Sequence, residues 1–158
     1  MRGKLIFVFS CLVILLIPST IASKSVVDLE VEESLSSIDI GILAGALSPD
    51  GESVLVVGMD GYARELSALK ADDRTKDVEL NTGRTVSLND VAWHPRGQAA
   101  LIAGDKGVAL RYETSNHGVT LVNGTGSIIG RDLSTVEWRQ AGDYAYFGAE
   151  DGGVWRFA

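Results

Sequence analysis

The stretch that decides the fold is LAGALSPDGESVLVVGMDGYAREL, from Leu43 to Leu66. It returns without a gap as NDVAWHPRGQAALIAGDKGVALRY, from Asn89 to Tyr112, and as STVEWRQAGDYAYFGAEDGGVWRF, from Ser134 to Phe157. The offsets between the copies are 46 and 45 residues. Because a fixed period of this length indicates a repeat architecture, the repeat is the best guide to the whole chain.

Equivalent positions of the three copies carry the same kind of residue in several columns. These columns are Gly51, Gly97 and Gly142; Gly61, Gly107 and Gly152; Pro49 and Pro95; and Trp93 and Trp138, with Leu47 in the first copy. Agreement at this many columns without a gap is improbable by chance. The large apolar residues of the last column are expected to fill the space between neighbouring sheets.

Each copy is predicted to form three short strands joined by tight turns. The first strand ends in a turn such as Ser48–Gly51, where proline fixes φ and glycine supplies a positive φ. The second strand is almost wholly apolar, which predicts burial on both faces. The predicted second strands are 54–57, 100–103 and 145–148; the third strands are 62–66, 108–112 and 153–157; fourth strands are 78–80 and 119–122.

A four-stranded antiparallel unit repeated at roughly 40 to 45 residues is typical of a β-propeller blade. The turn Leu47–Gly51, the apolar strand after it and the hairpin Asp60-Gly61 resemble those of WD-repeat and YVTN-type propellers. The resemblance covers residues 25–158 and rests on a motif that several propeller families share. No Gly-His pair opens a repeat and no Trp-Asp pair closes one, so the tetrad and the partner types of true WD repeats are not carried over.

The sequence therefore predicts an all-β, propeller-like fold of three four-stranded antiparallel blades. Propellers typically have about four to eight blades, so three are too few for closure. Two interpretations stay open: a homodimer in which two chains complete one ring, or a shortened member of a longer repeat family with an exposed sheet edge. The strand-like segment Val26–Val31 is expected to complete the last blade by pairing with residues 153–157 of the same or a partner chain.

Residues 1–23 have the pattern of a signal peptide, which leaves 24–158 as the repeat domain. Arg2 and Lys4 precede the apolar run Leu5–Ile17, and Thr20-Ile21-Ala22 is the expected cleavage signal. The alternative is an uncleaved membrane anchor over residues 5–22. Either way the repeat domain is predicted to be secreted or extracytoplasmic, and the sole cysteine, Cys11, is not part of it.

Removal of this segment leaves 12 Lys and Arg against 21 Asp and Glu. A surface with this excess of negative charge repels nucleic acid and anionic lipid headgroups. No nucleic-acid partner is expected, and contact with a membrane is expected only through an uncleaved signal segment.

The sequence offers no matched set of catalytic or metal-binding residues. Its two histidines, His94 and His117, are interpreted as a turn-lining residue and as part of a solvated loop. Asp60, Asp105 and Asp151 lie at the same hairpin corner of the three copies and could bind a cation. Asp and Gly are also what a hairpin turn favours for backbone reasons, so a turn is preferred to a cation site. No zinc, acyl-transfer or phosphate-binding motif occurs, so no cofactor and no enzyme activity are predicted.

The predicted function is that of an exported, non-catalytic binding or scaffold module whose loops face a protein or glycan partner. The candidate partner-facing residues are Asp60, Arg84, Lys106, Arg131 and Asp151. Two alternatives stay open: a propeller enzyme of the hydrolase or quinone-dependent type, and a lumenal or surface assembly factor.

Asn123-Gly124-Thr125 matches the acceptor pattern for N-glycosylation, and its turn-like surroundings favour accessibility. Asn123 is therefore the candidate modification site of an exported chain.

Overall fold

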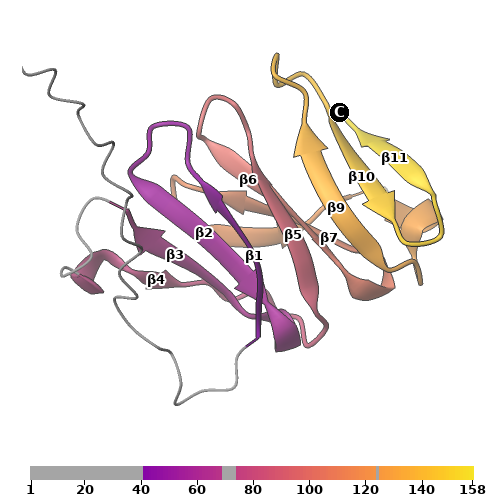
Figure 1. The fold of residues 1–158 in the computed structure, drawn as a ribbon, viewed down its shortest axis with the longest axis horizontal. Helices are drawn as coiled ribbons and strands as arrows, with labels where there is room; N and C mark the ends of the chain where they lie inside the picture. The colour runs from indigo at the N-terminus through magenta and orange to yellow at the C-terminus, as the bar shows by residue number, and fades with distance from the viewer. Residues whose placement is uncertain (1–40, 69–73, 124) are drawn as a thin grey trace, which may run out of the picture. The chain divides into compact units, whose positions relative to one another are not determined.

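Three antiparallel sheets follow one another along the chain in the computed structural model, which describes residues 41–68, 74–123 and 125–158 (Figure 1). The predicted signal peptide and the predicted strand Val26–Val31 lie outside the described residues. We call the three sheets blade 1, blade 2 and blade 3 in chain order.

The blades share one strand order. Blade 1 holds β1 (Ile42–Leu47), β2 (Ser53–Gly58), β3 (Ala63–Ser67) and β4 (Val78–Glu79), with short 3-10 turns η1 (Met59–Gly61) and η2 (Arg74–Lys76). Blade 2 holds β5 (Leu88–Trp93), β6 (Ala99–Gly104), β7 (Val108–Glu113) and β8 (Gly118–Leu121), with η3 (Asp105–Gly107). Blade 3 follows η4 (Thr125–Ile128) and holds β9 (Leu133–Trp138), β10 (Ala145–Ala149) and β11 (Val154–Phe157).

These sheets confirm the predicted all-β, propeller-like fold of antiparallel blades. The copies also share their register, because Leu47 pairs with Val54, Trp93 with Ala100 and Trp138 with Ala145. Blades 1 and 2 have four strands, whereas three strands of blade 3 lie within the described residues.

The turns between the first and second strands form as the proline and glycine positions predict. In blade 1 the Gly51 N–H donates to the Ser48 carbonyl over 2.9 Å, and Gly51 has φ of 76°. The Ser48 hydroxyl donates to the Asp50 carboxylate over 2.5 Å, and the Glu52 N–H donates to the same oxygen. These two donors, the hydroxyl first, lower the pKa of Asp50 below its ordinary value.

The blades stack face to face, and the core lies between them. We call the face of a blade toward the preceding blade its leading face, and the opposite one its trailing face. Trp93 and Tyr112 on the leading face of blade 2 share one buried cluster with Ala46 and Ala63 of blade 1. Trp138 and Phe147 on the leading face of blade 3 share a second cluster with blade 2. Strand β6 contributes to both clusters and is buried along its whole length, as predicted. The same prediction is wrong for β10, in which Tyr146 is 44% exposed on the trailing face of blade 3.

Polar contacts fix the order of the stack. The Trp93 indole N–H donates to the Ala46 carbonyl of blade 1 over 2.8 Å. Between blades 2 and 3, the Asp90 carboxylate accepts from the Val136 N–H at 2.8 Å and from the Thr135 hydroxyl at 2.9 Å. Each interface thus carries polar contacts that help to determine how each blade sits on the one before it, whereas the buried Trp138 indole N–H has no hydrogen-bond partner among the described residues.

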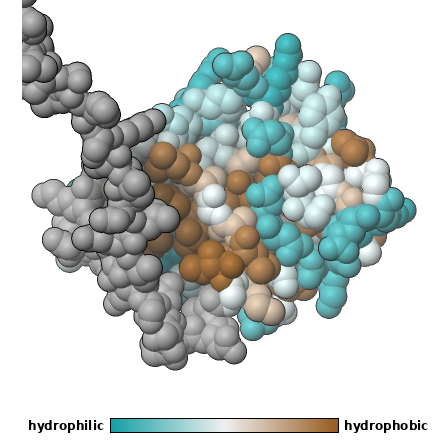
Figure 2. Space-filling view, viewed as in Figure 1, coloured by the Kyte–Doolittle hydropathy of each residue, from teal (hydrophilic) through white to brown (hydrophobic). Residues whose placement is uncertain are grey.

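One predicted core residue is not buried. Leu47 was expected to fill the space between sheets like its equivalents Trp93 and Trp138, which are each 8% exposed, but Leu47 is 59% exposed. The reason is its position on the leading face of blade 1, which no described residue covers. Figure 2 shows hydrophobic surface gathered over β1 and β2, where Ile42 and Leu43 are also exposed.

Candidate partner-binding rim

The five predicted partner-facing residues lie where the hairpins after each second strand meet the connectors between blades. Asp60, Lys106 and Asp151 are at the hairpins of blades 1, 2 and 3, whereas Arg84 and Arg131 are in the connectors that lead to blades 2 and 3. All except the half-buried Arg84 are exposed. We call this edge of the blades the rim.

Two hairpins of the rim are tight turns with left-handed backbone at both central residues. In blade 1 these are Asp60, with φ of 54° and ψ of 29°, and Gly61, with φ of 75°. The Tyr62 N–H closes the turn on the Met59 carbonyl over 3.0 Å. Lys106 and Gly107 repeat the conformation in blade 2. These are the dihedral angles of a type I′ turn, for which Asp-Gly is a preferred sequence.

The connectors dock on the hairpin glycines. The Gly61 N–H donates to the Val86 carbonyl over 2.8 Å, and the Thr82 hydroxyl donates to the Gly61 carbonyl over 2.8 Å. A Cβ on Gly61 would lie 1.9 Å from the Arg84 carbonyl oxygen, so the close approach requires glycine. Backbone contacts between the hairpin and the connector therefore fix the rim of blade 1, so that its side chains project from a rigid backbone.

The connector to blade 3 is attached in the same way. The Gly107 N–H donates to the Arg131 carbonyl over 2.6 Å, and the Lys106 N–H donates to the Asp132 carboxylate over 3.0 Å. The Arg131 guanidinium pairs with the Asp151 carboxylate of the next hairpin. Both side chains of this pair are about half exposed, so water screens the pair and it adds little stability. The two charges remain accessible to a partner.

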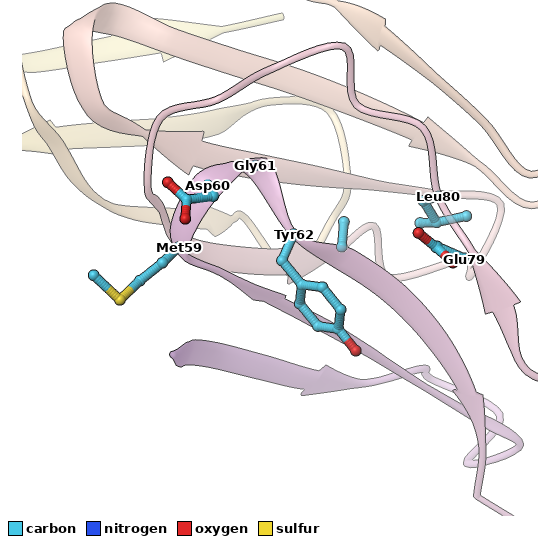
Figure 3. Close-up of a pocket in the computed structure, with 7 residues that line it drawn as sticks. Met59, Asp60, Gly61, Tyr62, Glu79 and Leu80 are labelled. Atoms are coloured by element: carbon cyan, nitrogen blue, oxygen red, sulfur yellow. The ribbon is translucent and has the colours of Figure 1, made fainter. Parts of the chain in front are cut away.

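A pocket of about 260 Å³ opens between the hairpin of blade 1 and strand β4 (Figure 3). It is lined by Met59, Asp60, Gly61, Tyr62, Ala63, Glu79 and Leu80. An open groove of about 600 Å³ runs on from Glu79 and Leu80 along the connector to Arg84 and Thr85. Two carboxylates beside a thioether and a leucine suit a side chain with an apolar stem and a cationic end.

The sequence identified part of this pocket. Asp60, one of the residues predicted to face a partner, lines it, and Arg84, another of them, lines the adjoining groove. Met59, Tyr62 and Glu79 were missed. The signal for Met59 and Tyr62 was their position on either side of the Asp60-Gly61 turn, whereas Glu79 reaches the pocket only because β4 pairs with β3.

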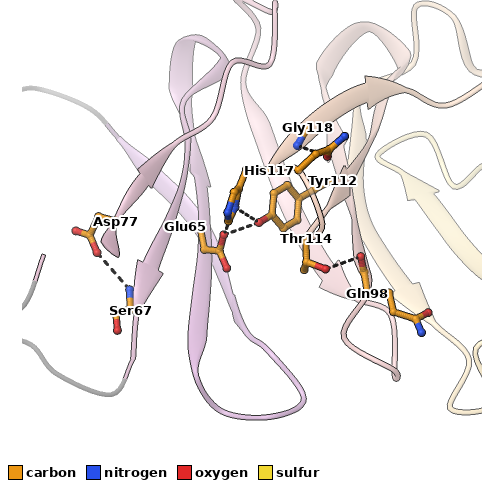
Figure 4. A network of polar contacts seen from close by, with 9 residues as sticks. Glu65, Ser67, Asp77, Gln98, Tyr112, Thr114, His117 and Gly118 are labelled. Atoms are coloured by element: carbon orange, nitrogen blue, oxygen red, sulfur yellow. Dashed lines mark hydrogen bonds and ion pairs between the residues drawn. The ribbon is translucent and has the colours of Figure 1, made fainter. Parts of the chain in front are cut away.

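A second polar cluster joins blades 1 and 2 away from the pocket (Figure 4). Glu65 of β3 is buried, and the hydroxyl of the fully buried Tyr112 of β7 donates to its carboxylate. His117 Nδ1 lies 2.9 Å from both the Glu65 carboxylate and the Tyr112 hydroxyl. Burial, together with the hydrogen bond to Glu65 and the charge of that carboxylate, raises the pKa of Tyr112 above its ordinary value. Tyr112 therefore stays a neutral donor.

His117 lies in the exposed turn between β7 and β8, as predicted for a solvated loop, and its imidazole, which is 46% exposed, also contacts Glu65 of blade 1. His117 has a left-handed backbone with φ of 52°, and the Gly118 N–H donates to the Asn116 side chain over 2.8 Å. That turn brings the imidazole against blade 1. His94 lines its turn as predicted: the Arg96 N–H donates to Nδ1, so Nε2 donates to the Gly142 carbonyl at 3.0 Å.

Other candidate sites can be placed from the described residues. Across residues 41–68, 74–123 and 125–158, no three His, Cys, Asp or Glu side chains gather closely enough to hold a metal ion. The same residues contain no helix long and apolar enough to span a membrane. Asn123 is exposed just beyond β8, so its side chain is accessible for modification.

Comparisons with known proteins bear on the fold. No family model matches the chain, and no curated protein matches its sequence. Among solved structures, hydrazine synthase from Kuenenia stuttgartiensis is similar, with a TM-score of 0.56 and 16% identity. The match covers 70% of this chain and 30% of the hydrazine synthase chain. The chain thus spans less than a third of that protein, and the likeness supports a propeller-like arrangement of antiparallel sheets.

Proposed function

We propose that this chain is an exported, non-catalytic binding or scaffold module that presents its propeller-type rim to a protein partner. The observation that supports this most is the pocket beside the Asp60 hairpin, with its adjoining groove, on a backbone fixed by glycine contacts. A site on a rigid frame loses little conformational freedom when it binds, which favours recognition.

The chemistry of the pocket favours a protein segment with a basic side chain. Asp60 and Glu79 offer negative charge, while the exposed Met59 offers apolar contact to the stem of a lysine or arginine. A glycan is less favoured, because sugar rings stack on exposed aromatic faces. Tyr62, the aromatic residue of this pocket, is half buried.

The proposal also covers where the protein is located and which superfamily its blades belong to. Export by the signal peptide of residues 1–23 would place the rim outside the cytoplasm, and Asn123 would be available there for glycosylation. We assign the blades to the propeller superfamily that contains WD-repeat and YVTN-type repeats, on the turn Leu47–Gly51 and the hairpin Asp60-Gly61.

The rim is tested by capture of partners from an extracytoplasmic extract on the immobilised repeat domain. The test variant is Asp60→Asn with Glu79→Gln, which removes both carboxylates without changing the shape of the pocket. The matched control is Asp143→Asn with Glu52→Gln, two exposed carboxylates on turns at the opposite end of the second strands.

We expect the control variant to capture the same basic protein as the wild type, and the rim variant to lose most of this capture. Peptides from the captured protein, with lysine or arginine replaced in turn, would identify the side chain that enters the pocket. Equal capture by the rim variant and the wild type would contradict the proposed function.

Export is tested separately by the intact mass of the mature protein. The proposal predicts loss of residues 1–22 or 1–23, so that the chain begins near Ser23. A protein that keeps these residues and remains in the membrane fraction would instead be anchored by residues 5–22.

A further inference from the structure

Two blade faces are not covered by any described residue. The leading face of blade 1 carries Leu47, Val54 and Val56, and the trailing face of blade 3 carries Tyr146 and Val154. Leu47, Tyr146 and Val154 are each more than 40% exposed, whereas Val56 is 8% exposed. Neither face includes the Asp60 pocket, so the inference drawn here does not rest on the proposed function.

The two internal interfaces follow one rule of size, in which a large side chain on one face meets a smaller one on the facing blade. Trp93 donates its indole N–H to Ala46, and Trp138 shares a buried cluster with Ala92, the equivalent of Ala46. In the neighbouring column, Val91 of the leading face shares a cluster with the larger Leu55 of the trailing face.

The two uncovered faces depart from this rule in opposite directions. On the leading face of blade 1, Leu47 stands in the column of Trp93 and Trp138 and is smaller than either. On the trailing face of blade 3, Glu137 stands in the column of Ala46 and Ala92 and is larger than either. In the next column the leading face of blade 1 has Gly45 in place of valine, and the trailing face of blade 3 has Tyr146 in place of leucine. The side chains on the leading face of blade 1 are thus smaller than their equivalents, and those on the trailing face of blade 3 are larger, so that the second set can fill volume that the first leaves.

The glycines in the turns between first and second strands also indicate that a contact is missing at blade 1. A Cβ on Gly97 would lie 3.7 Å from Pro49 of the preceding blade, and one on Gly142 would lie 2.7 Å from His94 Nε2 of the preceding blade. No atom of the described structure lies within 4 Å of the equivalent point on Gly51. The turn of blade 1 therefore has an open contact position where a preceding blade would fit.

The hairpin glycines show the matching gap at blade 3. The Cβ positions of Gly61 and Gly107 are blocked by the connector to the following blade, whereas no described atom lies within 4 Å of that of Gly152. Among the described residues, blade 1 thus lacks its preceding contact and blade 3 lacks its following contact.

We propose that a second copy of this chain occupies both faces, head to tail. The trailing face of blade 3 packs on the leading face of blade 1 of the other copy, with Tyr146 over Gly45 and Glu137 beside Leu47. Two such interfaces, related by a twofold axis, close a ring of six blades, which lies within the roughly four to eight blades of known propellers.

A face-to-face pairing of two copies through blade 1 alone fits these observations less well. It would leave Tyr146 and Val154 of blade 3 exposed to water, and it would bring Arg64 of one copy toward Arg64 of the other on the same leading face. Like charges across an interface oppose association. The head-to-tail arrangement avoids both.

The arrangement is tested by cysteine cross-linking of the full mature chain, which contains no native cysteine once the signal segment is removed. A short bismaleimide is added to Leu47→Cys, to Glu137→Cys and to the double variant. We expect the double variant alone to form covalent dimers in high yield. The matched control is Leu121→Cys with Ile129→Cys, two exposed apolar positions on neither face, which should not cross-link.

Cross-linking of Leu47→Cys by itself would show face-to-face pairing and overturn the proposal, as would the absence of cross-linking in the double variant. A native mass of two chains is expected. A mass of one chain, or an open series of larger assemblies, would overturn ring closure.

Replacement of one apolar contact gives a second test that does not depend on cysteine chemistry. Leu47→Glu buries a charge against the partner and should raise the dimer dissociation constant at least about tenfold. Ile129→Glu, at a side chain that is 73% exposed, should leave the constant unchanged. Retained circular dichroism of both variants shows that the blades are folded, and equal dissociation constants would contradict the proposal.

Discussion

Glu65 shows how one residue determines the contact between two blades. Its carboxylate is buried, and a buried charge is tolerated only where hydrogen bonds replace its lost water. Tyr112 and His117 of blade 2 supply those bonds to a strand of blade 1. The pairing makes the interface between blades 1 and 2 specific, because a shift of β7 would remove these donors from Glu65.

Replacement of Tyr112 by phenylalanine tests this contact. Phenylalanine fits the site sterically, since Phe157 occupies the equivalent column in blade 3, but it cannot donate to Glu65. Leaving a buried acceptor with one donor fewer should lower the free energy of unfolding by about 1–3 kcal/mol. Chemical denaturation measures it, and Tyr144→Phe, at a partly exposed ring in blade 3, is the control.

Trp138 provides a test of packing at the same scale. It is 8% exposed, with its ring 4.7 Å from that of His94 and 5.9 Å from that of Phe157. Trp138→Ala should therefore lower the free energy of unfolding by about 3–5 kcal/mol, as for other large-to-small core changes. Ile129→Ala, at an exposed side chain, should have little effect, and an unchanged midpoint for Trp138→Ala would mean that the blades do not pack on this ring.

The hairpin and its connector are the recurring element of the rim. Gly61 and Gly107 each combine a left-handed backbone with a close approach to the following connector. Blade 3 keeps the glycine, Gly152, with φ of 84°, but has no connector against it in the described structure. A side chain at Gly152 would therefore cost backbone strain alone, whereas a side chain at Gly61 or Gly107 would cost backbone strain and a clash with the connector.

A pair of alanine variants uses this difference. Gly152→Ala should cost roughly 1–2 kcal/mol, because alanine pays to adopt the left-handed region. Gly107→Ala pays the same strain and in addition places a Cβ 2.1 Å from the Ile128 carbonyl oxygen. Its loss of unfolding free energy should be clearly larger in a thermal or denaturant melt. Equal losses for the two variants would show that the connector does not dock on Gly107.

These elements were predictable from the sequence to the extent that their causes are local. Strand positions and hairpins follow from alternating apolar runs and from Pro, Asp and Gly at fixed offsets, so the repeat predicted them to within a residue or two. The contact of Glu65 with Tyr112 joins residues 47 apart, and no local pattern encodes it. The exposure of Leu47 was missed for the same reason, because column equivalence gives the residue type but not the neighbour that covers it.

At the scale of the whole molecule, the account depends on blades that stack in chain order through leading and trailing faces. The same contacts recur at both interfaces: an aromatic leading residue on a small trailing one, and a turn on the turn of the preceding blade. Because these contacts join neighbouring blades, the stacking also fixes the positions of the rim hairpins and connectors relative to one another.

Nuclear Overhauser contacts between blades test this stacking most directly. The account predicts contacts from the Trp93 indole N–H to Ala46, across blades 1 and 2, and between the rings of Trp138 and His94, across blades 2 and 3. It also predicts slow exchange of the buried Trp93 indole proton. Absence of both contacts in a folded, strand-rich protein would contradict the stacked-blade account.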